Sequence, residues 1–159
     1  MASVKWLERI ELLHQPFDGY QQAVGYRCKK LDGDDGVPVR QMKVKSLMAP
    51  PGIPDWYTGR RLLDAGRVII EGRAWSGAGV AVARLELAVD GQCRDAELEP
   101  ARERFAWQRW RCEWQATRGE HELSCRATDA AGARQPDEPD WNTGAMGNNA
   151  LHRLHVTVR

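Results

Sequence analysis

The chain has 159 residues, a formal net charge of +1 and acidic and basic residues in nearly equal numbers, which is enough for one domain with its own core. Because the charges are mixed along the chain, no large field of one sign is expected, and neither nucleic acid nor a membrane surface is expected as a partner. No apolar run approaches the roughly 20 residues that span a bilayer, and the first residues lack the apolar stretch of a signal peptide.

Tryptophan and cysteine are the informative entries of the composition. Seven tryptophans accompany only two phenylalanines, and tryptophan favours half-buried places on sheets and at interfaces. We therefore expect some of these rings in the core and others at an interface. The four cysteines are widely spaced and form no C-x-x-C pair, which favours buried free thiols over a disulfide framework or a zinc site. The sequence does not decide whether Cys112 and Cys125 form a disulfide bond.

The first third of the chain contains little periodic pattern. Residues 14–40 are rich in Asp, Gly and Gln and are interpreted as a linker or an extended crossing loop. Residues 32–36 resemble part of a calcium loop but lack its bidentate glutamate, so a solvated acidic turn is expected. Residues 48–54 contain three prolines, which favours an edge strand or a bend over a central strand.

From residue 66 onward, apolar residues alternate with polar ones at a period of two, which is typical of half-buried strands. Asp90-Gly91 predicts a tight turn, and Ala96 and Leu98 are expected in one short return strand after it. Residues 105–114 carry bulky side chains on both faces, so that strand is expected to be buried on one side and covered on the other. The predicted inward-facing residues of the other strands are Val68, Ile70, Ala74, Ala83, Leu85, Leu87, Val89, His121, Leu123, Cys125, Ala127, His152, Leu154, Val156 and Val158.

Short strands at roughly ten-residue spacing, separated by Gly, Pro and Asp turns, predict two packed antiparallel sheets. The fold class is therefore all-β, an immunoglobulin-like sandwich without the disulfide that pins antibody domains. Residues 129–149 contain no strand pattern, and an irregular stretch of that length is usually functional or packed against a partner.

A complete active site is not predicted. The sequence has neither a G-x-S-x-G nor an H-E-x-x-H motif, which excludes two common hydrolytic sites. His152 and His155 are three residues apart, so on a strand they face opposite ways and do not form a metal pair.

Several segments in order resemble the C-terminal dimerisation domain of sulfite oxidase-type molybdenum enzymes. They match that domain in order, spacing and composition from about residue 41 to the end, and Ser3-Val4-Lys5-Trp6-Leu7 with Arg9-Ile10 resembles the last segment of the preceding molybdopterin-binding domain. The dimerisation-domain segments are Gly72–Gly77, Asp90-Gly91, Ala106-Trp107 with Trp110, Cys125–Asp129, Gln135-Pro136, Trp141-Asn142, Asn148-Asn149 and His152.

The resemblance implies an immunoglobulin-like (E-set type) sandwich that pairs subunits about a two-fold axis. Residues 1–40 would be a remnant of the upstream molybdopterin-binding domain plus a linker, and residues 41–159 the dimerisation domain. The whole enzyme would use a molybdenum–molybdopterin cofactor to move an oxygen atom, typically converting sulfite to sulfate. The cysteine that binds molybdenum lies upstream in the family, so no cofactor is expected on this chain alone.

The resemblance also implies two sets of contact residues. Ser3, Val4 and Lys5 match a stretch that contacts the pterin phosphate. Asn142 belongs to the wall of the substrate pocket, where family members that oxidise sulfite carry an arginine two residues later. This chain has Gly144 at that position, so the sequence does not identify the substrate. Arg134 and Arg153 are candidate replacements.

Two other functions are weighed beside the dimerisation domain. The first is a stand-alone sandwich that binds protein or carbohydrate through exposed tryptophans, which would gain support if Lys5 and Trp6 formed a core strand. The second is a small enzyme with an unrecognised site.

Overall fold

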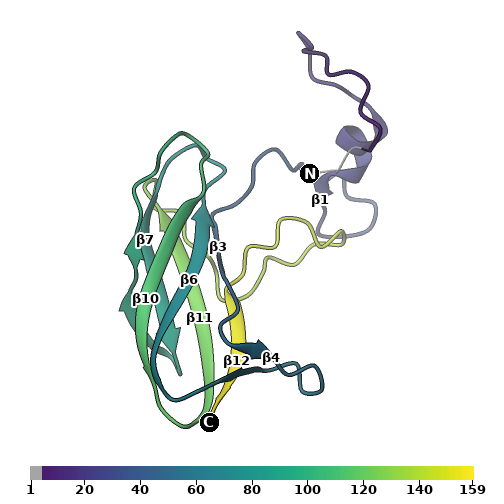
Figure 1. Cartoon of the computed structure of the whole chain (residues 1–159). Helices are drawn as coiled ribbons and strands as arrows, with labels where there is room; N and C mark the ends of the chain where they lie inside the picture. Colours follow the sequence, from purple (N-terminus) through teal and green to yellow (C-terminus); the bar gives the residue numbers. More distant parts are fainter. Residues whose placement is uncertain (1–4) are drawn as a thin grey trace. The chain divides into compact units, whose positions relative to one another are not determined.

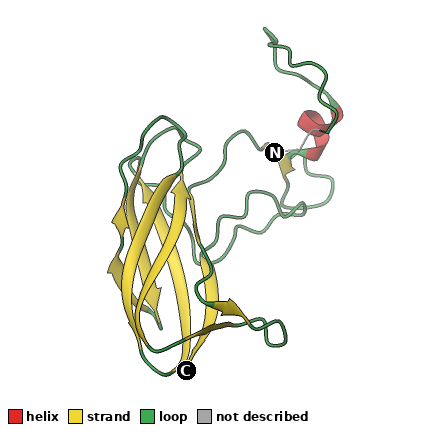
Figure 2. Ribbon diagram, viewed as in Figure 1, coloured by secondary structure: helices red, strands yellow, loops and turns green. Residues whose placement is uncertain are grey.

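The computed structural model describes residues 5–159 (Figure 1). The chain divides into two compact units, which are described separately here. The N-terminal unit contains the chain up to Val39 together with Asn142–Met146, and the larger unit contains Arg40–Trp141 together with Gly147–Arg159. The larger unit is a β-sandwich, whereas the N-terminal unit is built from short elements and turns (Figure 2).

Two sheets form the sandwich. One has four strands in the order β3-β6-β10-β9, and the other has six in the order β4-β5-β12-β11-β7-β8. Within the sandwich the strand pairings are antiparallel except for β5 with β12. The predicted all-β, immunoglobulin-like antiparallel sandwich is therefore confirmed. The strands are β3 (Lys45–Met48), β4 (Ile53–Pro54), β5 (Arg61–Leu63), β6 (Gly66–Trp75), β7 (Val82–Val89), β8 (Gln92–Asp95), β9 (Glu97–Leu98), β10 (Gln108–Ala116), β11 (Gly119–Asp129) and β12 (His152–Val158).

Alternating side chains of the long strands fill the space between the sheets. On β10, Trp110, Cys112 and Trp114 are buried, while Arg111 and Glu113 between them are exposed. The same period of two buries every second residue in the second half of β11 and at the end of β12. These alternations, which follow from the geometry of a strand, agree with the sequence prediction. The other face of β10, expected to be covered, is exposed in this chain.

A glycine on β6 makes room for the largest core side chain. Gly72 is the partner of both Trp110 and Met48 across the sheet. A Cβ atom at Gly72 would lie 2.4 Å from the Trp110 ring and 2.2 Å from the carbonyl oxygen of Leu47. The indole therefore lies across β6 only because this position has no side chain.

Strand β7 begins differently from the prediction. The alternation places Ala83 in the core, but Ala83 is exposed and Val82 is buried. The pairing of β7 with β11 changes register between Thr128 and Asp129. Ala83 is thus the extra residue of a β-bulge, which moves every residue before it to the opposite face.

The return strand after Asp90-Gly91 also differs from the prediction. The tight turn is present, because β7 pairs directly with β8. However, β8 ends at Asp95, and the two residues of β9 pair with β10 in the other sheet. Ala96 and Leu98 therefore do not share one strand, because the chain crosses between the sheets at Ala96.

The N-terminal unit contains more structure than a linker. Gln21–Gly25 form one turn of π-helix, and Arg27–Cys28 (β1) pair with Val37–Pro38 (β2). The prediction of a structureless stretch over residues 14–40 is wrong in this part. Even so, none of residues 5–39 is buried. Across residues 5–159 no helix is long and apolar enough to cross a membrane.

The seven tryptophans divide between the core and the surface. Trp75, Trp110 and Trp114 are buried, whereas the side chains of four others are more than half exposed. These four are Trp6, Trp56, Trp107 and Trp141. The four cysteines are free thiols, and Cys112 and Cys125 are buried. These two residues therefore do not form a disulfide bond with each other.

Candidate functional site

The irregular segment between β11 and β12 is fixed to the sandwich at its start by a buried carboxylate. Asp129 is 3% exposed. It accepts a hydrogen bond from the Ser76 hydroxyl at 2.7 Å and from the backbone N–H groups of Ala131 and Ala133. These donors satisfy a group that is shielded from water, and they hold the turn that begins the segment.

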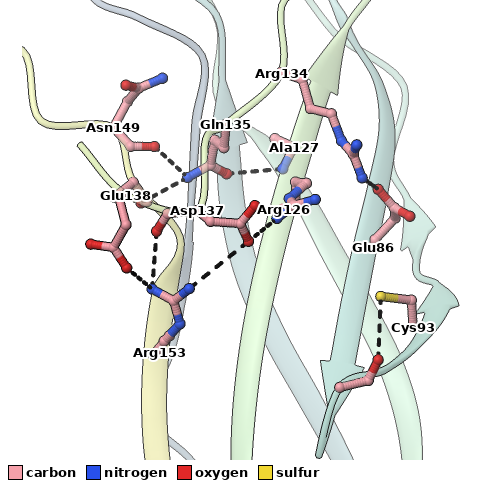
Figure 3. Close-up of polar contacts among 12 residues, drawn as sticks. Glu86, Cys93, Arg126, Ala127, Arg134, Gln135, Asp137, Glu138, Asn149 and Arg153 are labelled. Atoms are coloured by element: carbon pink, nitrogen blue, oxygen red, sulfur yellow. Dashed lines mark hydrogen bonds and ion pairs between the residues drawn. The ribbon is translucent and has the colours of Figure 1, made fainter. Parts of the chain in front are cut away.

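A buried amide then joins the segment to both sheets. Gln135 is 1% exposed, and its carbonyl oxygen accepts from the backbone N–H groups of Ser46 at 2.8 Å and Ala127 at 2.9 Å. Its amide nitrogen donates to the carbonyls of Asn149 and Ala150 at 3.1 and 3.2 Å (Figure 3). One side chain therefore bridges β3, β11 and the far end of the segment.

Arg153 on β12 contacts a group of acidic residues. Its guanidinium donates to the carbonyl oxygen of Asp137 at 3.1 Å and lies 3.8 to 3.9 Å from the carboxylates of Asp137, Glu138 and Glu122. The Asp137 carboxylate also pairs with Arg126 on β11 (Figure 3). The cluster holds the segment against the outer face of β11 and β12.

Arg134 belongs to a second, separate ion-pair group. It lies 3.1 Å from the carboxylate of Glu86 on β7, which also pairs with Arg84 at 3.3 Å. The sequence pattern places Glu86 on the outward face of β7, yet its exposed fraction is only 8%. The two arginines cover it, and a shielded carboxylate of this kind requires such partners.

The two candidate anion ligands thus have carboxylate partners of their own. Arg134 extends toward Glu86 on β7, whereas Arg153 lies among the acidic residues beside β12 (Figure 3). An oxyanion would have to compete with these carboxylates for the same N–H donors. The arrangement is suited to fixing the segment in place.

Asn142 and Gly144 lie in the part of the segment that belongs to the N-terminal unit. The Asn142 side chain is 8% exposed, donates to the Met146 carbonyl at 2.9 Å and accepts from its N–H at 2.7 Å. The amide therefore closes the turn, in which Ala145 has a φ of 50°. Gly144 is exposed, and a Cβ there would lie 3.3 Å from the Met146 side chain and 3.8 Å from Oδ1 of Asn142.

The histidines of β12 do not form a metal pair. The Nδ1 atom of His152 accepts a hydrogen bond from the backbone N–H of Met48 at 3.0 Å, which requires that nitrogen to be unprotonated. Burial, with a smaller contribution from Lys45, lowers the pKa of His152 and keeps the ring neutral. His155 is exposed on the opposite face of the strand, as predicted.

Metal-ligand groups are also missing elsewhere in the described chain. Among residues 5–159 no group of three or more His, Cys, Asp or Glu side chains is placed to hold a metal ion. Burial raises the pKa of Cys112, and it raises the pKa of Cys125 to about 11. Because a thiol binds a metal as the thiolate, these two are poor ligands.

The predicted pterin-contact residues are only partly described. Ser3 and Val4 lie outside residues 5–159. Lys5 is exposed, and Trp6 beside it is 95% exposed. Neither belongs to a strand of the core, which is the arrangement that a stand-alone binding module would have required.

A shallow groove of about 840 Å³ runs over the outer face of the four-stranded sheet. Trp107 forms one wall and stacks on Trp75, with ring centroids 4.6 Å apart. Arg73 and Arg109, direct neighbours across β6 and β10, line its floor. The pattern of residues 105–114 predicts that this face is covered but does not identify the groove.

Comparisons with known proteins place this architecture in context. Residues 38–159 match the family model for the Mo-co oxidoreductase dimerisation domain. Human mitochondrial sulfite oxidase is 32% identical over 174 residues, which cover 98% of this chain and 30% of the human protein. Barley NAD(P)H nitrate reductase is 28% identical over 178 residues, covering 98% of this chain and 20% of the reductase.

A solved structure supports the fold. The sulfane dehydrogenase SoxCD from Paracoccus pantotrophus superposes with a TM-score of 0.73 at 22% sequence identity, over 88% of this chain and 36% of that one. The chain thus spans between about a fifth and about a third of the length of these relatives.

Proposed function

The chain belongs to the Mo-co oxidoreductase dimerisation domain family, and from this premise we propose that it pairs two copies of a sulfite oxidase-type oxidoreductase. In this role it carries no complete active site. The sandwich provides a surface for the second copy, and the segment between β11 and β12 contributes one wall of the substrate pocket.

The family match over residues 38–159 supports the pairing function, and the ion pairs of the segment between β11 and β12 support the absence of a complete active site. Arg134 and Arg153, the residues best suited to bind an anion, are each paired with carboxylates. Arginines that already donate to carboxylates are less available to an oxyanion, and their ion pairs hold the segment in position. On this proposal the sandwich acts through its surfaces, which contact the second copy and form one wall of the substrate pocket.

The molybdenum cofactor is proposed for the longer enzyme, and the two buried thiols of this chain do not fit it. A molybdenum–pterin centre needs a deprotonated thiol, whereas burial keeps the Cys112 and Cys125 thiols protonated. Lys5 would place a positive charge near the pterin phosphate, together with Ser3 and Val4. We therefore derive no chemical step from this chain.

The pocket-wall assignment concerns Asn142 and Gly144. The Asn142 amide is used to close its turn, so its role would be to hold the wall in shape. Gly144 supplies no charged side chain at the position where sulfite-oxidising relatives have an arginine. The pocket of this protein would therefore carry less positive charge than the pockets of those relatives, and its substrate could differ from sulfite.

Sedimentation equilibrium of the 159-residue chain between 1 and 100 µM tests the pairing. The expected result is a reversible dimer. Molybdenum analysis of the same sample is expected to find less than about 0.1 atom per chain after expression with the cofactor available. A monomer at every concentration, or one molybdenum atom bound per chain, would contradict the proposal.

A further inference from the structure

Two aromatic side chains at the tip of the β4–β5 hairpin are almost fully exposed. Trp56 is 90% exposed and Tyr57 is 98% exposed, and Ile53 at the start of the hairpin is 62% exposed. Scattered single apolar residues on a surface are ordinary, but an adjacent tryptophan and tyrosine at a projecting turn are the residue types that anchor protein interfaces.

The turn that carries these rings is held by hydrogen bonds on both sides. The Asp55 carboxylate accepts from the Thr58 hydroxyl at 2.6 Å and from the Tyr57 N–H at 3.0 Å. The backbone of Asp55 bonds to Arg60 and Gly59, at 2.9 Å in each case. The tip therefore has one conformation before binding, which reduces the entropy lost when the rings become buried.

The base of the hairpin is equally constrained. The Arg61 guanidinium donates to the carbonyl oxygens of Pro50, Pro51 and Gly52. Gly52 has a φ of 63°, and a Cβ there would lie 2.1 Å from the Leu62 carbonyl oxygen. These bonds at the base and in the turn hold the backbone that carries the two exposed rings in a defined position beside β5 and β12.

The hairpin lies at the end of the sandwich opposite to the point where the chain enters it from residue 40. The loop after β6 lies at the entry end, where the N–H of Gly77 bonds to the Met42 carbonyl. β5 instead pairs with the last residues of β12, and the hairpin projects near the C-terminus (Figure 1). Two other exposed aromatic side chains of the sandwich, Phe105 and Trp107, belong to the segment before β10 and are not part of the hairpin.

We propose that Trp56 and Tyr57 are the anchor residues of the interface between two copies of this chain. The inference rests on the proposed pairing function and identifies the surface that performs it. In a two-fold dimer each copy contributes the same pair of rings. Four rings of about 200 Å² each, with the matching surface that receives them, amount to roughly 1,600 Å², the size of a standard stable interface.

The test uses sedimentation equilibrium of the 159-residue chain and of a variant with Trp56→Ala and Tyr57→Ala. Because anchor residues carry most of the binding energy, the dimer dissociation constant is expected to rise at least about 100-fold. Both rings are exposed in the single chain, so the melting temperature of the monomeric variant should equal that of the wild-type monomer, which separates lost pairing from lost folding.

Two matched controls show whether any exposed aromatic or apolar group would have the same effect. Trp107→Ala removes an exposed ring at the entry end, and Leu12→Ser removes a 94% exposed apolar side chain of the N-terminal unit. Both controls are expected to leave the dissociation constant within about threefold of wild type. A larger effect of either control than of the tip variant would overturn the inference.

The remaining outcomes separate this inference from the function on which it rests. A wild-type chain that stays monomeric up to 100 µM contradicts pairing itself, and the inference with it. A wild-type dimer that the tip variant forms equally well overturns the inference alone and leaves the pairing function intact.

Discussion

The sandwich buries its apolar side chains in a core, whereas residues 5–39 leave theirs exposed. In the sandwich the apolar residues of β6, β7, β10, β11 and β12 pack between two sheets, and several of them have no exposed surface. In residues 5–39 no residue is buried, and Trp6, Ile10 and Leu12 are at least 80% exposed. The two regions thus differ in whether the chain itself supplies a core.

The difference indicates where each region obtains its stability. Exposed apolar side chains in such density normally mark a surface that another protein segment covers. Residues 5–39 therefore fit the proposal that they belong to a larger upstream domain, whereas residues 40–159 can fold around their own core. Substitutions in the two regions should consequently have very different effects.

Trp110→Ala tests the core, and Trp6→Ala is the matched substitution in the N-terminal unit. Trp110 is 2% exposed and packs over Gly72, so its loss should destabilise the fold by about 3–5 kcal/mol. Trp6 is 95% exposed, and its loss should change stability by less than about 0.5 kcal/mol. Urea unfolding followed by circular dichroism measures both.

Equal effects of the two tryptophan substitutions would show that residues 5–39 have a core of their own. That result would contradict the claim that only the sandwich has a core.

Gln135→Ala tests the buried amide that joins the irregular segment to the sheets. The substitution leaves the backbone N–H groups of Ser46 and Ala127 without their acceptor, and an unsatisfied buried donor costs about 1–3 kcal/mol. A loss of about 3 kcal/mol in the free energy of unfolding is expected. The control is Gln115→Ala on the exposed face of β10, which should cost less than about 0.5 kcal/mol.

His121→Gln tests an ion pair that joins two turns of the sandwich. His121 Nδ1 lies 2.7 Å from the Asp90 carboxylate, and Nε2 lies 2.8 Å from the Thr117 carbonyl oxygen. Two acceptors favour the doubly protonated ring, and the hydrogen bond with Asp90 raises the pKa of His121 while lowering that of Asp90. At pH 5.5 the variant should be about 1 kcal/mol less stable, a figure reduced for the half-exposed carboxylate.

The pH dependence of that difference follows from the direction of the two shifts. The His121 contribution is fully present below the ordinary histidine pKa of 6.5 and is lost as the pH rises through the raised value. The Asp90 contribution is present above the ordinary value of 3.8 and is lost as the pH falls through the lowered value. Thermal unfolding at pH 5.5 and pH 9 should show the variant approaching wild type at the higher pH.

Gly144→Arg has the smallest expected effect. The backbone there does not have a positive φ, and the new Cβ would come no closer than 3.3 Å to the Met146 side chain and 3.8 Å to Oδ1 of Asn142. The melting temperature should therefore change by less than about 2 °C. A loss of several degrees would show that this glycine is required by the turn, and the open position at the proposed pocket wall would then have a structural explanation.

The sequence was a reliable guide to the fold wherever one strand alone determined the pattern. The alternation of Trp110, Cys112 and Trp114 predicts their burial because successive side chains of a strand face opposite ways. It could not reveal the bulge at Ala83 or the crossing at Ala96, since both depend on pairing with strands distant in the sequence.

The site was less predictable for the same reason. Arg134 and Arg153 were identified as cationic candidates, but their carboxylate partners include Glu86, which is 48 positions away from Arg134. Nothing local in the sequence shows that such a pair forms. Trp56 and Tyr57 were also missed, because a proline-rich edge gives no sign of how far the next turn projects.

Hydrogen–deuterium exchange of the 159-residue chain, measured at 100 µM and at 1 µM, tests the central claim most directly. We predict that the amides of β6, β10 and β11 exchange slowly at both concentrations, that residues 5–39 exchange within seconds, and that residues 53–63 are protected only at the higher concentration. Protection of residues 5–39 equal to that of β10 would contradict the claim that the sandwich alone supplies a core. Equal protection of residues 53–63 at both concentrations would contradict pairing through the tip of the β4–β5 hairpin.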